Sequence, residues 1–341
     1  MAESYAQKHP VNEILSSVLF EAVQDLSLLI QDEVLPPVDV STVGRTGTLL
    51  IENDRNLMGS PDADDLRAPG AERKPITSHI RTTTTYTCDI RCLSDAIPME
   101  DIEDSQFPGD EEERMVRRVG RSLRLKREDR VAQFFMSGAP AWTTVAQAAI
   151  PGGSGLQVNV AGATPAVDWH LAHDIVRGTS NGVDPSDMII PYDVVRACGR
   201  NLELRGYVGD ATLGVSGGGD RVMPTSAILA VLAQSVGNGS LRIHVGAMRH
   251  ETAVKGVATA QADQWTDTVW IGLLPGPNAV TVGKSRVRVE PAAAVSFSSM
   301  GWVGGMYDTL DLTARHVWAE YHRGDTVINL NRGLRISNVL A

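Results

Sequence analysis

The sequence predicts an α+β protein, and three observations support that prediction. The segment 111–136 has the pattern of one long amphipathic helix. The segment 80–90 is rich in threonine, which favours a β-strand. After residue 140, shorter helical and strand patterns follow one another without an internal repeat. With 341 residues the chain is long enough to bury a sizeable core.

The first predicted element is an amphipathic helix at 11–31. Its apolar residues recur at i, i+3, i+4 and i+7, Pro10 suits the first turn, and Pro36 and Pro37 end the helix. Such a stripe needs an apolar surface, either in the chain's own core or on a neighbouring subunit. The candidate intersubunit contacts on this stripe are Leu15, Leu19 and Leu26.

Next, strands at 43–51 and 80–90 predict a long β-hairpin with a wide tip. The second strand is polar on both faces, so we expect it to project into solvent or to lie over another molecule. A loop of this length without its own core is uncommon in a compact domain. Its tip carries both charge signs, and the candidates for ion pairs with a neighbour are Arg67, Arg73, Asp62, Asp64 and Asp65.

The helix at 111–136 has two chemically different sides. Three glutamates at 111–113 suit the positive end of the helix dipole, and apolar residues such as Val119 and Leu123 share one face. Arginines spaced by three and four residues share the opposite face. That face is either solvated surface or a contact with an acidic neighbouring segment or nucleic acid phosphates. The candidate contacts are Arg114, Arg117, Arg121 and Arg124.

The remaining elements are short and their order indicates no repeated βαβ unit. We predict helices at 168–177, with Asp168 as N-cap, at 192–202 and at 224–236, and strands at 187–191, 208–215, 241–245, 270–274 and 301–311 (the last a strand or turn). The chain should end in two antiparallel strands, 315–321 and 327–336, that turn at Gly324-Asp325.

Composition excludes several classes of protein. A net charge of −10 argues against a protein that coats nucleic acid with its whole surface. Arginine outnumbers lysine, which favours fixed interfaces. Three sparse cysteines indicate a reducing compartment. We expect no signal peptide and no transmembrane helix, because the N-terminus has no basic region before an apolar run and no window reaches 18 apolar residues.

Motifs for chemistry are weak. The segment 214–218 resembles a nucleophile elbow, but no helix follows it, and a surface loop explains it better. His170 and His173 lie three apart on a predicted helix, and His244 and His322 lack carboxylates at useful spacing in the sequence. The sequence therefore predicts no catalytic, cofactor or metal site and no enzyme activity. A soluble serine hydrolase using Ser216 is kept as an alternative.

The order of these segments resembles the major capsid proteins of tailed bacteriophages, with the Hong Kong 97-like fold. The resemblance covers nearly the whole chain. VLPPVDVSTVGRTGTL is similar to the passage from arm to extended loop, and DDLRAPGAERKPI to the loop tip. TCDIRCLSDAIPMED with the helix that follows resembles the return strand and spine helix. DIVRGTSNGVDPSDMIIPYDVVRAC resembles the step from peripheral to axial domain.

The resemblance implies a domain layout and a function. The layout is an N-terminal arm (1–42), an extended β-hairpin loop (43–85), a peripheral domain (86–180 and 312–341) with spine helix 111–136, and an axial domain (181–311). The chain would form hexamers and pentamers of an icosahedral shell around double-stranded DNA. The implied partners are a scaffolding protein, a portal and a decoration protein. Localisation would be the virion, after assembly in the host cytoplasm, with no membrane and no cofactor.

Two departures qualify this expectation, and one alternative shares the fold. The chain lacks the long N-terminal scaffolding extension of some members, which implies a separate scaffolding protein or removal before residue 1. Lys74 is the only lysine near the loop tip, so we expect a noncovalent shell. The alternative is a bacterial encapsulin nanocompartment, which would enclose enzymes rather than DNA.

Overall fold

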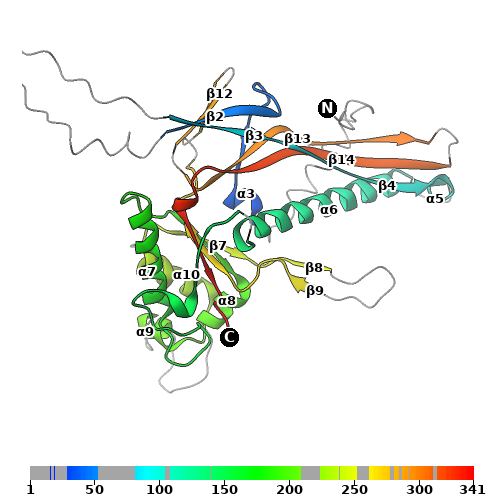
Figure 1. Cartoon of the computed structure of the whole chain (residues 1–341). Coiled ribbons are helices and arrows are strands. Elements are labelled where there is room, and N and C mark those ends of the chain that lie inside the picture. Colours follow the sequence, from blue (N-terminus) through cyan, green and yellow to red (C-terminus); the bar gives the residue numbers. More distant parts are fainter. Residues whose placement is uncertain are drawn as a thin grey trace, which may run out of the picture.

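The computed structural model confirms the α+β class and shows two lobes, one elongated and one more compact (Figure 1). We call them the sheet lobe and the helical lobe. The structure describes residues 16, 19, 29–52, 81–103, 108–138, 140–208, 223–237, 239–251, 261–276, 280–283, 286–290, 292–309 and 313–341.

The sheet lobe is a four-stranded sheet with one long helix lying along it (Figure 1). Its strands, in spatial order, are β1 (Pro37–Asp39), β13 (Ala294–Asp308), β14 (Ala314–Val327) and β4 (Asp89–Pro98). β1 pairs with β13 in parallel, and the other pairs are antiparallel. The short helix α5 (Met99–Glu103) follows β4, and the long helix α6 (Pro108–Met136) confirms the helix expected at 111–136.

The first half of α6 packs on this sheet through the apolar face that its periodicity predicts. Val116, Val119 and Leu123 are buried in one cluster with Val317 and Tyr321 of β14. Fully burying a Val or Leu side chain contributes about 1.5–3 kcal/mol. The sheet therefore holds the helix along its length and leaves the opposite side of this half exposed.

The base of the predicted hairpin is confirmed. A second four-stranded sheet contains β11 (Val280–Val282), β12 (Arg286–Val289), β2 (Thr46–Glu52) and β3 (Arg81–Thr87) in spatial order. β2 and β3 are antiparallel, with Thr46 opposite Thr87. Thr82, Thr83 and Thr85 are exposed, as the polar pattern predicts, whereas Tyr86 is buried against Phe297. The tip, residues 53–80, lies outside the described residues.

The helical lobe is built on a mixed five-stranded sheet. In spatial order its strands are β5 (Thr143–Ala146), β15 (Gly333–Ser337), β10 (Val269–Gly272), β6 (Asp187–Pro191) and β7 (Arg242–Gly246). Its helices are α7 (Pro165–Thr179), α8 (Tyr192–Cys198), α9 (Leu202–Val208) and α10 (Thr225–Gly237). Its short 3-10 helices are η1 (Gln147–Ala149) and η2 (Leu330–Arg332), and a separate hairpin is formed by β8 (Arg249–Glu251) and β9 (Gln261–Asp263). The strands expected at 187–191, 241–245 and 270–274 and the helix expected at 224–236 are confirmed.

An aromatic cluster joins the two lobes. Phe135, near the end of α6, lies 4.7 Å from Trp270 of β10 and 6.2 Å from Trp142, between ring centroids. Val34 and Leu35 belong to the same cluster and are fully buried. They come from the short helix α3 (Gln31–Val34) and the residue after it. The end of the arm therefore forms part of the core between the lobes.

The predicted turn at Gly324-Asp325 is wrong, because β14 runs through both residues. Gly324 is needed for a different reason: a Cβ there would lie 1.9 Å from the carbonyl oxygen of Thr87. Asp325 is held by Arg127 of α6. The last strand, β15, consequently lies in the other lobe instead of pairing with β14.

Three smaller predictions also need correction. The helix expected at 192–202 ends at Cys198, and a separate helix, α9, covers part of a segment left unassigned. Residue 208, where a strand was expected to begin, is instead the last residue of α9. The rest of that expected strand, 209–215, lies outside the described residues. Asp168 is not the N-cap of α7. It lies inside the first turn, fully buried, and accepts hydrogen bonds from Ser154 and Gln147.

The expected domain layout has boundaries at residues 180 and 311, and the strand pairing divides the chain between the two lobes at other places. β5 and α7 belong to the helical lobe with β15, although they lie in the segments assigned to the peripheral domain. Conversely, β13 belongs to the sheet lobe. β13 is also longer than the strand or turn expected at 301–311, since its buried first half pairs with β1 and β14.

Candidate assembly surfaces

The outer face of the first half of α6 carries the predicted arginines. Arg114 is 75% exposed and donates to Glu111 over 3.0 Å, and Arg117 lies 2.7 Å from Glu113. Arg121 is also exposed. Exposed ion pairs within one helix contribute only about 0–1 kcal/mol. The glutamates of the same helix therefore hold these arginines weakly, and a partner could compete for them.

Arg124 does not belong to this exposed face, which corrects the prediction. Helical spacing does place Arg124 in line with Arg121, but Arg124 is only 8% exposed. In the second half of α6 the arm covers this side of the helix, since Glu128, four residues further on, accepts hydrogen bonds from the backbone of α3. Burial lowers the pKa of the Arg124 guanidinium, and Asp32 and Glu128 oppose that shift. Arg124 is an internal residue, not a surface contact.

The arm is fastened to α6 by a buried carboxylate. Glu128 is fully buried and accepts from the amide of Gln31 at 2.9 Å and from Trp265 Nε1 at 2.9 Å. Burial raises the pKa of Glu128, because the charged form loses water, and these hydrogen bonds act in the opposite direction. A second link joins Asp32 to Arg323 of β14. Polar contacts thus fix the register of the arm on the spine helix.

A third link ties the arm to the helical lobe. His244 of β7 is 3% exposed, and its Nε2 lies 3.0 Å from Asp187. Its Nδ1 lies 3.1 Å from the Glu33 carboxylate of α3, an ion-pair distance without hydrogen-bond geometry. Burial acts to raise the pKa of Asp187. Hydrogen bonds from His244 and Ser186, with the charge of Arg242, outweigh burial and lower it.

One buried ion pair crosses the sheet lobe. Arg127 of α6 is 2% exposed and donates to both carboxylate oxygens of Asp325, with Nη2 to Oδ1 at 2.7 Å. Arg127 also donates to Ser296 of β13 over 3.1 Å. Burial alone would raise the pKa of Asp325, but the Arg127 guanidinium outweighs it and the pKa is lowered. Sequence spacing could not reveal this pair, since the two residues are far apart in the chain.

The other predicted contacts are distributed as follows. Leu19 is fully buried within its own chain, in the cluster that holds Ile97 and Val317, so it has no surface to offer a neighbouring subunit. Nearby, the Ser16 hydroxyl donates to the Gly304 carbonyl over 3.1 Å. The remaining candidates lie outside the described residues: Leu15, Leu26, Asp62, Asp64, Asp65, Arg67 and Arg73.

His322 and His244 have carboxylate partners, which corrects the sequence prediction. His322 lies 2.7 Å from Glu320, and His244 meets Asp187 through the pairing of β6 with β7. Ser186, Asp187 and His244 do not form a catalytic triad, because the Ser186 hydroxyl hydrogen-bonds the Asp187 carboxylate and not the His244 imidazole. Ser216 lies outside the described residues.

The described residues also include possible metal ligands and three cysteine thiols. Across the described ranges, no group of three His, Cys, Asp or Glu side chains could hold a metal ion. Burial, with a smaller contribution from Glu320, raises the pKa of Cys92 to about 12. Burial also raises the pKa of the Cys88 and Cys198 thiols. Because the thiolate is the reactive form, these cysteines are poor nucleophiles.

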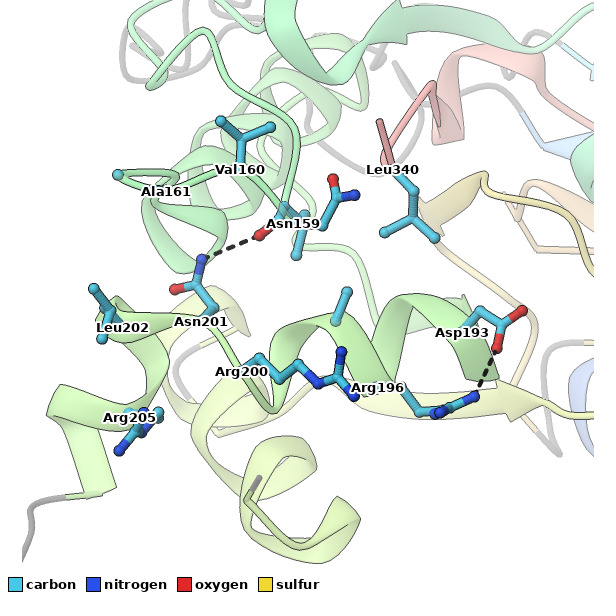
Figure 2. Close-up of a pocket in the computed structure, with 13 residues that line it drawn as sticks. Asn159, Val160, Ala161, Asp193, Arg196, Arg200, Asn201, Leu202, Arg205 and Leu340 are labelled. Carbon is cyan, nitrogen blue, oxygen red and sulfur yellow. Dashed lines mark hydrogen bonds and ion pairs between the residues drawn. The ribbon is translucent and has the colours of Figure 1, made fainter. Parts of the chain in front are cut away.

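A pocket of about 720 Å³ opens on the helical lobe (Figure 2). Its walls are α8, α9, the turn at 158–162 and Leu340 near the end of the chain. Arg196, Arg200 and Arg205 line it, and Asp193 is the one carboxylate among the lining residues. The pocket is therefore positively charged, although the chain as a whole is acidic.

Within the described part of the chain, no helix combines the length and apolar character needed to cross a membrane. The sequence matches no protein-family model and no curated protein. Solved structures, by contrast, match over nearly the whole chain. A phage-related protein from Bordetella bronchiseptica superposes with a TM-score of 0.63 over 99% of both chains at 17% identity.

Two more distant structures extend the comparison. A virus-like particle from Pyrococcus furiosus gives a TM-score of 0.52, covering 95% of this chain and 98% of that one at 10% identity. A protein of Microbacterium phage Oxtober96 gives 0.50, covering 90% of each chain at 11% identity. The chain therefore has the Hong Kong 97-like fold of bacteriophage capsid proteins.

Proposed function

We propose that this chain is the major capsid protein of a tailed double-stranded DNA bacteriophage. It assembles as hexamers and pentamers into the icosahedral head shell and encloses the genome. The observation that carries this proposal is the agreement of fold over 99% of both chains with the phage-related protein from Bordetella bronchiseptica. A coverage of 99% leaves almost no part of the chain unmatched, including the described end of the arm and the strands β2 and β3, which a compact enzyme would not need.

The shape of the subunit supports assembly. The hairpin of β2 and β3 carries exposed threonines on a sheet that leads away from both lobes (Figure 1). Such a strand has little apolar surface for its own core and fits a neighbouring molecule. We therefore keep the loop-tip residues Arg67, Arg73, Asp62, Asp64 and Asp65 as proposed intersubunit contacts, together with Leu15 and Leu26. A reconstruction of the assembled shell would test each one.

The proposal includes further partners and a location. A scaffolding protein and a portal act during assembly in the host cytoplasm, a decoration protein binds the finished shell, and the virion is the final location. The packaged DNA lies on the inner face. No enzyme activity is expected, and turnover of an ester substrate that Ser216→Ala abolishes would support the hydrolase alternative instead.

Purified protein, expressed with and without its scaffolding partner, should form closed shells in negative-stain images. Particles isolated from infected cells should contain double-stranded DNA, measured by absorbance and nuclease protection. Shells that enclose an enzyme and no genome would support the nanocompartment alternative instead. Protein that remains monomeric under all assembly conditions would contradict both shell hypotheses.

Reversing Arg117 and Arg121 to glutamate should block formation of empty shells. The exposed face of α6 would then repel the acidic segment of a neighbour that we propose as its partner, such as Glu100 to Asp104. Lys126→Glu is the matched control, because Lys126 is exposed on another side of the same helix. Particle yield by sedimentation is the measurement. If empty shells form normally and only genome packaging fails, the arginines contact DNA and not protein.

A further inference from the structure

Helices α8 and α9 of the helical lobe carry exposed apolar side chains. Among the described residues, five large hydrophobic side chains are exposed, and three of them are on α8 or α9: Tyr192, Leu202 and Tyr207. Leu202 is the most exposed, at 72%. A fourth, Val167, is in the first turn of α7, which α9 contacts through Glu203. Leu202 also lines the pocket described above, so exposed apolar surface and charge meet there, as they do at interaction sites.

The same helices supply the cations of the pocket in Figure 2. Arg196 is 61% exposed and lies 3.7 Å from Asp193, a distance at the limit of an ion pair. Arg200 is exposed in the short segment between α8 and α9. Glu203 does not line the pocket, and its carboxylate accepts from the amide of Ala166 at 3.0 Å, at the start of α7. The lining therefore carries a net positive charge, and Arg196 and Arg200 expose guanidinium groups that a carboxylate can reach.

The walls of the pocket are fixed before any partner arrives. The Asn201 amide donates to the carbonyls of Val158 and Ala163, over 3.2 and 3.1 Å, and its oxygen accepts from the amide of Glu203. Asn201 thus locks the turn at 158–162 onto the start of α9 (Figure 2). Gln157 and Asn159 hydrogen-bond the chain end at Leu340 and Ala341. A preformed site loses less conformational entropy on binding.

We propose that this pocket, with the exposed Leu202 in its wall, binds a carboxylate-bearing surface segment of a second copy of this chain. The inference deepens the proposed shell function by naming one contact within it. Arginine is one of the residue types that dominate binding energy at protein interfaces. A second copy fits the charge, because the chain has 41 acidic against 31 basic residues and presents carboxylates in excess.

The exposed Leu202 in the pocket wall favours a protein over other anionic partners. A free phosphate or a DNA backbone would engage the arginines but would not cover Leu202. A protein segment that places a carboxylate in the pocket covers the Leu202 side chain at the same time. Removing this side chain from water then adds a hydrophobic contribution to the ion pairs.

The test replaces Leu202 with the photoreactive amino acid benzoylphenylalanine. Irradiation of assembled particles should produce chain-to-chain adducts that are absent from dissociated subunits, and mass spectrometry should map them to a segment rich in Asp or Glu. The same probe at the exposed Leu330 is the control for non-specific reaction. Adducts only to DNA, to another protein or within the same chain would overturn the proposal.

A pair of variants tests the charge separately. Arg200→Glu should reduce particle yield strongly and Arg200→Lys partly, since lysine keeps the charge but loses bidentate geometry. Arg177→Glu, on an exposed cation of the same lobe outside the pocket, should leave the yield unchanged. Circular dichroism of each variant shows whether the subunit is folded. Wild-type yield from folded Arg200→Glu protein would overturn the pocket proposal alone, whereas absence of particles from the wild-type chain would overturn the shell function as well.

Discussion

Replacing Asp325 with alanine should destabilise the subunit by about 3–5 kcal/mol, the cost of leaving a buried charge without its partner. Arg127 would remain 2% exposed inside the sheet lobe with only Ser296 to accept from its guanidinium. Urea denaturation of unassembled subunits measures the change. The matched control is Arg114→Ala, which breaks an exposed pair and should cost about 0–1 kcal/mol.

The same pair predicts a pH dependence. The pKa of Asp325 is lower in the folded chain than in the unfolded chain, so the pair stabilises the fold fully above the unfolded value of about 3.9. This contribution is lost as the pH falls through the lower, folded value. The difference in free energy of unfolding between wild type and Asp325→Ala should therefore shrink only below about pH 4. A difference that is small at pH 7 would show that Arg127 finds another partner.

Gly324→Ala should also weaken the subunit strongly, although alanine normally suits a strand better than glycine. The new methyl group would lie 1.9 Å from the Thr87 carbonyl oxygen, and that neighbour is backbone that cannot rotate away. Either β14 or the end of β3 must shift. Overpacking of this kind costs about 1–3 kcal/mol and occasionally more.

The control for this variant lies in the neighbouring strand. Gly301→Ala adds the same methyl group to β13, where nothing lies within 4 Å of the built Cβ. Thermal denaturation should show a lower melting temperature for Gly324→Ala and little change for Gly301→Ala. Equal melting temperatures would mean that β14 and the end of β3 move apart to accept the methyl group without loss of stability.

Local patterns in the chain were enough to predict several of the regular elements. Apolar spacing placed the long helix, whose end at Met136 agrees with the structure, and helix α10. Composition predicted the threonine-rich strand and the fully buried strand β6. These elements depend on side-chain periodicity and on turn residues, which can be read within a short window.

Partners across the fold could not be read in this way. Asp325 follows a glycine, a pattern that local rules interpret as a turn, and only the approach of Arg127 and Thr87 explains why a strand continues there. Arg124 has the helical spacing of an exposed arginine, and it is buried because the arm crosses that side of α6. His244 acquires Asp187 and Glu33 from two other elements. Local periodicity determines which face of an element is apolar, whereas the identity of the covering segment depends on contacts between residues distant in sequence, which only the tertiary structure brings together.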